Sequence, residues 1–149
     1  MPEELKAEIE KIQKEASTQG PPFEVEASLE VGILGQQMRF DKDSLKVKAG
    51  KNVELVFNNN DSLPLMHNLL LVKPGSRMKI VNEAIAMGVD GMVNNYVPDN
   101  DNILASTPLV QIGSSYKLYF KAPSKPGKYE YVCTYPGHGL TMWGTLTVE

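Results

Sequence analysis

The sequence predicts an all-β sandwich with one short helix in a long connection and an extra amphipathic helix at the N-terminus. Two observations carry the prediction of a sandwich. Beyond Pro22, short segments alternate between apolar and polar residues, as strands do when they bury one face. Pieces rich in Gly, Pro, Asn and Asp separate these segments, and several short strands joined by such turns favour a sandwich. At 149 residues, the chain has the length of one such domain.

The first residues are predicted to form a segment of their own. From Pro2 to about Thr18, leucine and isoleucine recur at spacings of four and three between charged residues, which predicts an amphipathic helix with a narrow apolar stripe. The stretch 19–22 includes two prolines and ends any helix. We therefore expect residues 1–22 to be a helix and linker, and residues 23–149 to be the domain. The helix could pack on the domain, pair with another chain or be the stub of a membrane tether.

The strands of the domain are predicted from alternating polarity and from the turn residues that flank them. They cover Phe23–Ala27, Asn52–Phe57, Asn68–Val72, Tyr116–Lys121, Lys128–Val132 and Gly144–Val148. Between the third and fourth, Arg77 to Met87 carries apolar residues at helical spacing before a glycine, which predicts a short helix. The loop that follows, from Asp90 to Thr107, is rich in Asn and Asp and is expected to be irregular.

Composition and charge exclude several classes of protein. A hydrophobic content of 42% with 22% charged residues is ordinary for a soluble domain, and no apolar run approaches the roughly 18 residues of a membrane helix. The formal net charge of −3 gives no broad basic field, so nucleic acid is not expected as a partner. The N-terminus lacks the apolar stretch of a secretory signal peptide, so the chain is either cytoplasmic or a form whose targeting segment has been removed.

One loop concentrates unusual side chains. Cys133, the single cysteine, is followed by His138 and Met142 in a Cys-x4-His-x3-Met spacing. Both ends of this loop touch predicted strands, and its glycines and proline allow the chain to turn back over a small centre. A thiol, an imidazole and a thioether could therefore converge on one metal ion.

The second histidine, His67, opens a predicted strand elsewhere in the chain and would supply another nitrogen ligand. Two imidazoles and a thiolate with a weak axial methionine form the ligand set of blue-copper electron-transfer sites. Zinc would be served less well by a thioether. The spacing therefore favours copper held by His67, Cys133, His138 and Met142.

The same residues resemble a known family. The segment CTYPGHGLTM, preceded by KYEYV and followed by WGTLTVE, is similar to the copper loop of azurins and auracyanins, and LPLMHNLLLV resembles the segment around their upstream histidine. The resemblance covers about residues 40–149 and implies a cupredoxin-like Greek-key β-sandwich whose short helix lies in the flap between ligands. Azurins have glycine where this chain has Met66, and they carry a disulfide that this chain cannot form. These departures favour an auracyanin-like site with four ligands.

The resemblance also implies roles for residues around the metal. The backbone amides of Asn68 and Tyr135 would hydrogen-bond the Cys133 sulfur, and the Asn68 side chain would tie the two ligand loops together, with Thr134 beside them. Such contacts orient ligands and tune the reduction potential. An apolar patch around the edge of His138, which we expect to be exposed, would receive redox partners. The residues expected in this patch are Leu65, Pro136, Gly137, Gly139 and Leu140.

The function implied is single-electron transfer, without catalysis, between a cytochrome-type donor and an oxidase or reductase acceptor. Family resemblance further implies a monomer that works in the periplasm or outside the cytoplasmic membrane, with the N-terminal segment as a tether. Three alternatives are a copper enzyme related to nitrite reductases, a copper sensor, chaperone or storage module, and a red-copper relative with an open site. The first would need further histidines, the second metal-transfer motifs, and the third a replacement for Met142. Without this spacing, a lone cysteine, histidine or methionine is more often a packing residue than a ligand. Trp143 is expected to support the core or the loop.

Overall fold

The computed structural model describes residues 21–149, so the helix predicted over Pro2 to Thr18 lies outside the described residues. No helix in the described part of the chain is both long and apolar enough to cross a membrane. The strands are β1 (Ala27–Val31), β2 (Ile33–Leu34), β3 (Arg39–Phe40), β4 (Ser44–Val47), β5 (Asn52–Asn58), β6 (Leu70–Val72), β7 (Ile103–Ser106), β8 (Ser115–Lys121), β9 (Gly127–Val132) and β10 (Trp143–Val148). The helices are α2 (Arg77–Ala86) and two 3-10 turns, η1 (Gly35–Gln37) and η2 (Gly88–Asp90).

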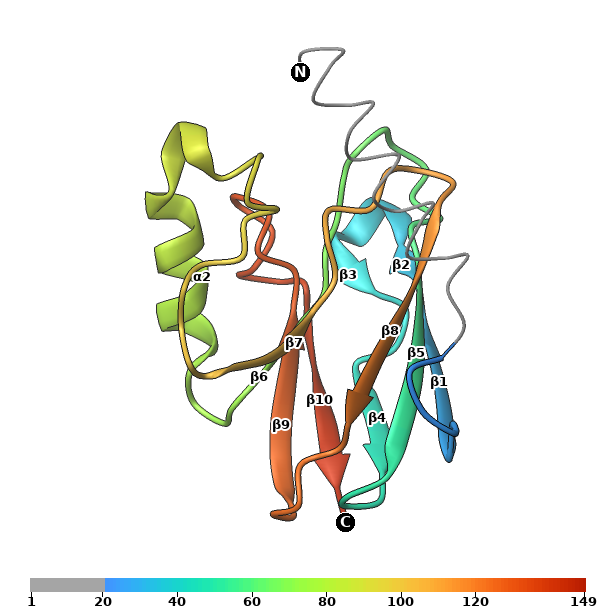
Figure 1. Cartoon of the computed structure of the whole chain (residues 1–149). Helices are drawn as coiled ribbons and strands as arrows, with labels where there is room; N and C mark the ends of the chain where they lie inside the picture. The colour runs from blue at the N-terminus through green and yellow to red at the C-terminus, as the bar shows by residue number, and fades with distance from the viewer. Residues whose placement is uncertain (1–20) are drawn as a thin grey trace.

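The strands form the two layers of a sandwich (Figure 1). One sheet has the order β1-β5-β8, and the other has the order β4-β10-β9-β6-β7. β1 pairs in parallel with β5 and β4 in parallel with β10, whereas the other pairs in these sheets are antiparallel. β2 and β3 form a small hairpin at one side. The prediction of an all-β fold with one short helix in a long connection is confirmed within the described residues.

The core lies between the two sheets and follows from the alternation seen in the sequence. On β5, Val53, Leu55 and Phe57 are buried, while the residues between them are half-buried. They pack in one cluster with Tyr131 of β9 and Leu146 of β10. A slip of one residue would turn every buried side chain of a strand to the other face, so this core fixes the register.

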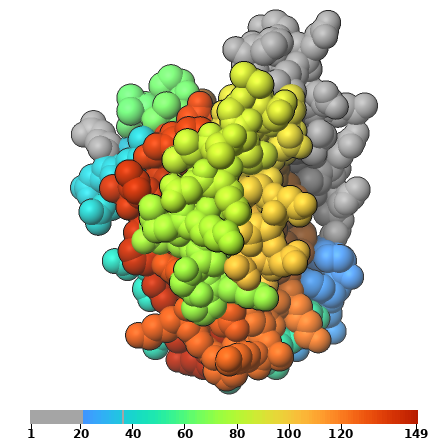
Figure 2. All heavy atoms as spheres, turned by 90° about the vertical axis from the view of Figure 1, so that its left-hand side faces the viewer, coloured from blue at the N-terminus to red at the C-terminus, as the bar shows by residue number. Residues whose placement is uncertain are grey.

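Helix α2 covers the outer face of the larger sheet. Its buried residues Ile80 and Val81 pack against Leu70, Val72 and Val132 of the sheet. Figure 2 shows the green-yellow helix and the gold loop after it lying across this face of the molecule. This packing brings the start of the helix toward the loop between β9 and β10.

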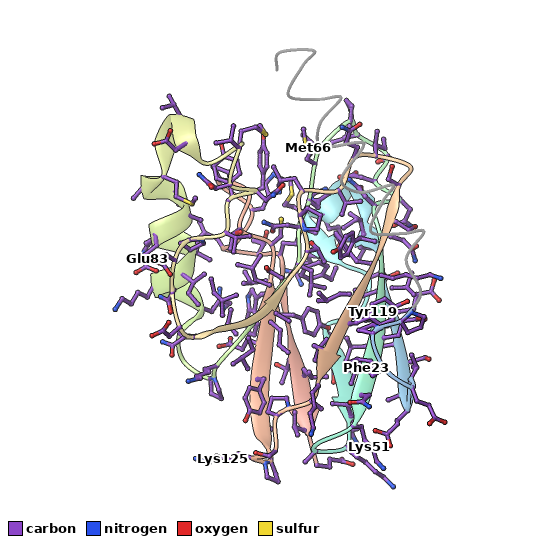
Figure 3. All side chains as sticks on the ribbon, in the orientation of Figure 1. Phe23, Lys51, Met66, Glu83, Tyr119 and Lys125 are labelled. Atoms are coloured by element: carbon purple, nitrogen blue, oxygen red, sulfur yellow. The ribbon has the colours of Figure 1, made fainter. Side chains whose placement is uncertain are left out.

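The structure differs from the prediction at the ends of the domain's strands. The strand expected over Phe23–Ala27 begins only at Ala27, which pairs with Val53 of β5. Glu26 still donates a backbone hydrogen bond to the Asn52 carbonyl at 2.9 Å, but the ladder does not extend to Phe23. Phe23 instead packs its ring edge-on against Tyr119, with centroids 6.1 Å apart (Figure 3).

Short strands were missed where pairing depends on distant segments. β7 lies inside the stretch 90–107 that was expected to be irregular, and it is held by antiparallel pairing with β6. β6 itself begins at Leu70, two residues later than predicted, because His67 makes only an isolated bridge to Val110.

The loops that carry the candidate ligands gather at one end of the sandwich. Met66, next to His67, lies at this end, whereas Lys51 and Lys125 mark the opposite end (Figure 3). The chain therefore brings segments about seventy residues apart to one place.

Candidate metal centre

The loop between β9 and β10 closes on itself through backbone hydrogen bonds. The amide of Cys133 donates to the carbonyl of Met142 at 3.0 Å, and the amide of Met142 donates to the carbonyl of His138 at 2.9 Å. His138 donates in turn to the carbonyl of Tyr135 at 2.9 Å. Gly137 has a φ of 86°, a left-handed conformation that glycine adopts without strain. The backbone alone thus directs Cys133, His138 and Met142 to one centre.

His67 joins this centre from the segment before β6, the strand that pairs with β9. Its backbone exchanges two hydrogen bonds with Val110, at 3.2 and 2.7 Å. The His67 Nδ1 atom lies 3.8 Å from the Cys133 Sγ atom, and the His138 Nδ1 atom lies 3.7 Å from the same sulfur. The ligand atoms of the three residues all lie within 4.8 Å of one another. Met142 is fully buried and belongs to the same packed cluster as Cys133.

Burial controls the ionisation of the thiol. Desolvation raises the pKa of Cys133 to about 12, although backbone hydrogen bonds from Asn68 and Tyr135 act in the opposite direction. These two amides are the ones that the family resemblance implied for the sulfur. They prepare the sulfur for negative charge, which only a nearby cation would make stable in so dry a position.

The two imidazoles are held in their neutral forms. Desolvation and the neighbouring His67 together lower the pKa of His138 to about 4, while Asp61 acts against this shift. Desolvation also lowers the pKa of His67, against a hydrogen bond with Asp61. Neutral imidazoles keep a free lone pair, which is the form that binds metal ions.

Asn68 and Thr134, each directly after a residue of the centre, connect the two segments. The Asn68 Oδ1 atom accepts from the Thr134 amide at 2.8 Å, and its Nδ2 group donates to Thr134 Oγ1 and to the carbonyl of Asn95, both at 2.9 Å. Thr134 Oγ1 donates to the carbonyl of Tyr96 at 2.6 Å. Asn95 and Tyr96 both have positive φ, 57° and 53°, so these hydrogen bonds hold a strained turn against the centre.

The residues expected at a docking patch differ in exposure. Leu140 is 65% exposed and Gly137 is exposed, whereas Leu65 and Pro136 are half-buried. Leu63, which the sequence did not single out, is 49% exposed close to Leu65 in the chain.

Two expectations about this surface are corrected. Gly139 is buried, since a Cβ there would come within 2.5 Å of Val81 on α2. His138 is only 6% exposed, because the ring of Tyr135 lies against it with centroids 4.8 Å apart. The imidazole therefore lies just beneath the surface.

Arg77, at the start of α2, braces the loop from outside. Its Nη1 group donates to the carbonyl of Gly139 at 3.0 Å, and its Nε group donates to Glu130 at 3.2 Å. The guanidinium also lies 4.2 Å from the centroid of the Trp143 ring. Sequence reasoning took Trp143 as core or loop support, but its side chain is 37% exposed and supports the loop by stacking with Arg77. No local pattern in the sequence indicated this contact.

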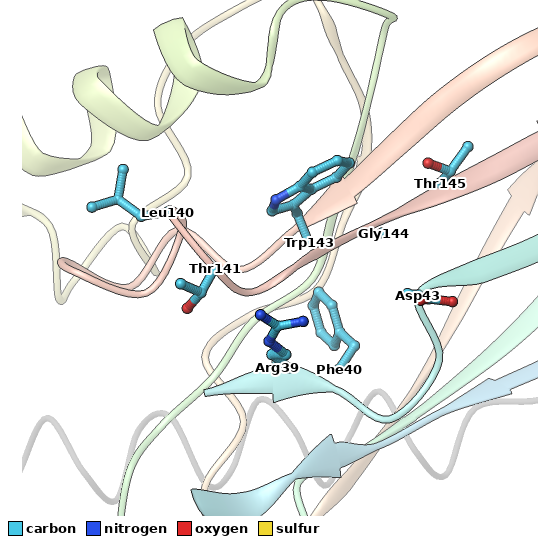
Figure 4. Close-up of a pocket in the computed structure, with 8 residues that line it drawn as sticks. All are labelled: Arg39, Phe40, Asp43, Leu140, Thr141, Trp143, Gly144 and Thr145. Carbon is cyan, nitrogen blue, oxygen red and sulfur yellow. The ribbon is translucent and has the colours of Figure 1, made fainter. Parts of the chain in front are cut away.

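A cavity of about 380 Å³ lies beside the loop (Figure 4). The side chains around it come from β3, from the loop itself and from the start of β10, and include Arg39, Phe40, Leu140 and Trp143. None of the four residues of the centre lines it. This cavity therefore gives a small molecule no access to the thiol or the imidazoles.

Asp61 is the residue of the centre that sequence reasoning missed. Its Oδ2 atom lies 2.7 Å from the His67 Nε2 atom, and both side chains are buried. The only signal in the sequence was an acidic residue inside an asparagine-rich turn that ends shortly before the histidine.

The donor set fits a copper ion. Two neutral imidazoles and a buried thiol face one point, a thioether lies beside them, and such soft and borderline ligands suit a type 1 copper. A family model described as copper-binding proteins of the plastocyanin/azurin family matches residues 27–149. The chain belongs to this family. Its cluster of His67, Cys133, His138 and Met142 fits one type 1 copper ion.

Individual members of the plastocyanin/azurin family are similar to most of the chain. Auracyanin-A of Chloroflexus aurantiacus is 39% identical over 123 residues, which cover 82% of this chain and 74% of that protein. Azurin of Pseudomonas denitrificans is 32% identical over 131 residues, covering 83% of this chain and all of that protein. The solved structure of auracyanin A, described as a "blue" copper protein, superimposes with a TM-score of 0.74 and 38% identity over 82% of this chain and 98% of that chain. The cupredoxin-like fold implied by the resemblance is confirmed.

Proposed function

We propose that the protein carries single electrons between redox proteins through one copper ion held by His67, Cys133, His138 and Met142. The observation that carries the proposal is the closed, buried cluster in which both Nδ1 atoms face the Cys133 sulfur. Bound there, copper supplies a one-electron Cu(I)/Cu(II) couple. The auracyanin-like sequence supports four ligands, without the carbonyl of Met66.

The chain's own residues account for fast and reversible transfer. Their backbone hydrogen bonds fix the ligand loop, and Asn68 locks it to the segment of His67. A preorganised shell of this kind limits rearrangement when the charge of the centre changes. Burial keeps water from the thiol and leaves no open position for a substrate, which supports a carrier over a copper enzyme.

Electrons would enter and leave near His138, the least buried of the four ligands. Leu140, Gly137, Pro136 and Leu65 would form a small apolar docking surface around it, and the exposed Leu63 extends this set. Small, weakly bound interfaces suit partners that must separate quickly. We infer a cytochrome-type donor and an oxidase or reductase acceptor for a monomeric carrier.

We also propose that the protein works outside the cytoplasm, in the periplasm or anchored to a membrane. The relatives named auracyanin and azurin support this location. The match to the family model begins at residue 27, which supports residues 1–22 as a linker or tether and residues 23–149 as the carrier domain.

Voltammetry and rapid mixing test the proposal. The copper-loaded protein should show a reversible one-electron wave and should exchange electrons with a reduced c-type cytochrome in a second-order reaction. Leu140→Glu should slow that reaction at least severalfold and leave the potential nearly unchanged. Leu104→Glu, at a leucine on β7 that is 38% exposed, is the control with the same change of charge. An irreversible wave would refute the carrier function, and equal rates for the two variants would refute the docking surface.

A further inference from the structure

We propose that Asp61 is a positioning residue that fixes the tautomer of His67 and lowers the reduction potential of the centre through its buried negative charge. The inference rests on the proposed function, since it concerns the same copper centre. The Asp61 carboxylate is the partner of the His67 imidazole, so it both orients the ring and places a negative charge beside the metal centre.

The contact between the two side chains is short and dry. The Asp61 Oδ2 atom lies 2.7 Å from His67 Nε2, and the side chains are 1% and 0% exposed. The other carboxylate oxygen, Oδ1, accepts from the Leu63 amide at 3.0 Å. Both oxygens are therefore engaged, and the carboxylate has no freedom to turn away from the imidazole.

The surrounding turn holds the acid and the imidazole on one framework. The Asp61 amide donates to Asn59 Oδ1 at 3.2 Å, and the Asn59 amide group donates to the carbonyls of Leu65 and Val110, both at 2.8 Å. Val110 is also the backbone partner of His67. A buried network with every member satisfied is rigid, so the 2.7 Å contact is a fixed feature of the site.

The hydrogen bond decides which nitrogen faces the metal. An ionised carboxylate can only accept, so His67 Nε2 carries the proton and Nδ1 keeps its lone pair, directed at the Cys133 sulfur 3.8 Å away. The two Asp61 oxygens face the His67 ring nitrogen at 2.7 Å and the Leu63 amide at 3.0 Å, and donors placed in this way favour the ionised carboxylate. Carboxylate–histidine–metal arrangements orient the ring and increase its donor strength.

The charge has a direction that can be measured. A negative charge next to a ligand stabilises Cu(II) more than Cu(I), since Cu(II) carries the larger positive charge. Removing it should weaken Cu(II) binding more than Cu(I) binding and raise the potential. Loss of such a partner costs roughly 10- to 100-fold in metal affinity, and each tenfold difference between the two oxidation states corresponds to about 59 mV.

Asparagine cannot replace Asp61 without loss, because the site needs two acceptors. If the amide oxygen of Asn faces the Leu63 amide, its NH2 group faces His67 Nε2 and opposes the required tautomer. If the oxygen faces His67, the NH2 group opposes the Leu63 amide. Asp61→Asn therefore removes the charge and disturbs one hydrogen bond while nearly preserving volume.

The test compares Asp61→Asn with Asp101→Asn, the same substitution at an exposed turn residue before β7. Both copper-loaded variants are examined by visible spectroscopy and voltammetry, and the Cu(I) forms by ¹H–¹⁵N NMR of the imidazoles. We expect wild-type His67 to show a slowly exchanging proton on Nε2. Asp61→Asn should raise the potential, lower Cu(II) affinity about tenfold or more and speed exchange of that proton, while Asp101→Asn leaves all three unchanged.

The outcomes separate this inference from the proposed function. An Asp61→Asn protein that keeps its thiolate-to-copper band but shows an unchanged potential would overturn the role of Asp61 and leave the copper site intact. Absence of the band in the wild-type protein would overturn the proposed function itself. If Asp61→Asn does not fold, the wild-type spectrum still decides, because a proton on Nδ1 in place of Nε2 contradicts the inference.

Discussion

Replacing Asn68 by alanine should destabilise the protein more than any comparable change at its surface. The Asn68 side chain makes three hydrogen bonds within the fold, all at 2.8–2.9 Å, and is fully buried. Alanine would leave the Thr134 amide and the Asn95 carbonyl without these partners. At roughly 1–3 kcal/mol for each buried group left unsatisfied, the free energy of unfolding should fall by about 4 kcal/mol.

Urea unfolding of the metal-free proteins measures this loss without interference from copper binding. With an m-value of roughly 2 kcal/mol/M, the midpoint should fall by about 2 M. Asn94→Ala is the matched control, since Asn94 is exposed and its side chain donates one hydrogen bond, to the carbonyl of Asp90. A loss below about 1 kcal/mol for Asn68→Ala, or one equal to that of the control, would refute the view that Asn68 locks the two ligand segments together.

Three further predictions concern the contact of Arg77 with the ligand loop, the pH dependence of stability, and the protons released on copper binding. Arg77→Met should lower the free energy of unfolding by about 2 kcal/mol, because it removes a charged hydrogen bond to the Gly139 carbonyl and a cation–π contact. A midpoint of thermal unfolding no lower than that of the exposed variant Lys79→Met would contradict this. The free energy of unfolding of the metal-free protein should rise as the pH increases from about 4 to 6.5. In that window the His138 imidazole is neutral in the folded protein and protonated in the unfolded chain, so this residue contributes on the order of 3 kcal/mol to the rise. A flat pH profile in urea titrations would be the contrary result. At pH 8, Cu(II) binding should release about one proton from Cys133, since the pKa of this thiol is raised to about 12 and the imidazoles are already neutral. Calorimetry in buffers of different ionisation enthalpy would count the released protons. A value near zero would be inconsistent with a thiolate ligand.

The sequence predicts the local part of the centre well and the long-range part poorly. Cys133, His138 and Met142 belong to one loop, so their spacing alone indicates that they converge. His67 was found because there are only two histidines and because its surroundings resemble a known ligand segment. Both signals are read along the chain, without knowledge of which strands are neighbours.

Contacts between distant segments had no such signal. Arg77 reaches the loop only because α2 packs on the outer face of the larger sheet, and Asp61 reaches His67 only through a turn that Asn59 pins to Val110. For the same reason β7 was missed, since its pairing with β6 supplies what its own residues do not predict. The burial of His138 likewise depends on the Tyr135 ring, which spacing does not place.

The central claim is that Cys133 binds copper as a thiolate together with two imidazoles. The visible absorption and electron paramagnetic resonance spectra of the Cu(II)-loaded protein, recorded beside those of Cys133→Ser, test it most directly. The account predicts an intense thiolate-to-copper band and the narrow copper hyperfine splitting of a type 1 site, both lost in the serine variant. A folded, copper-loaded protein that lacks the band would contradict the account and return Cys133 to the role of a buried packing residue.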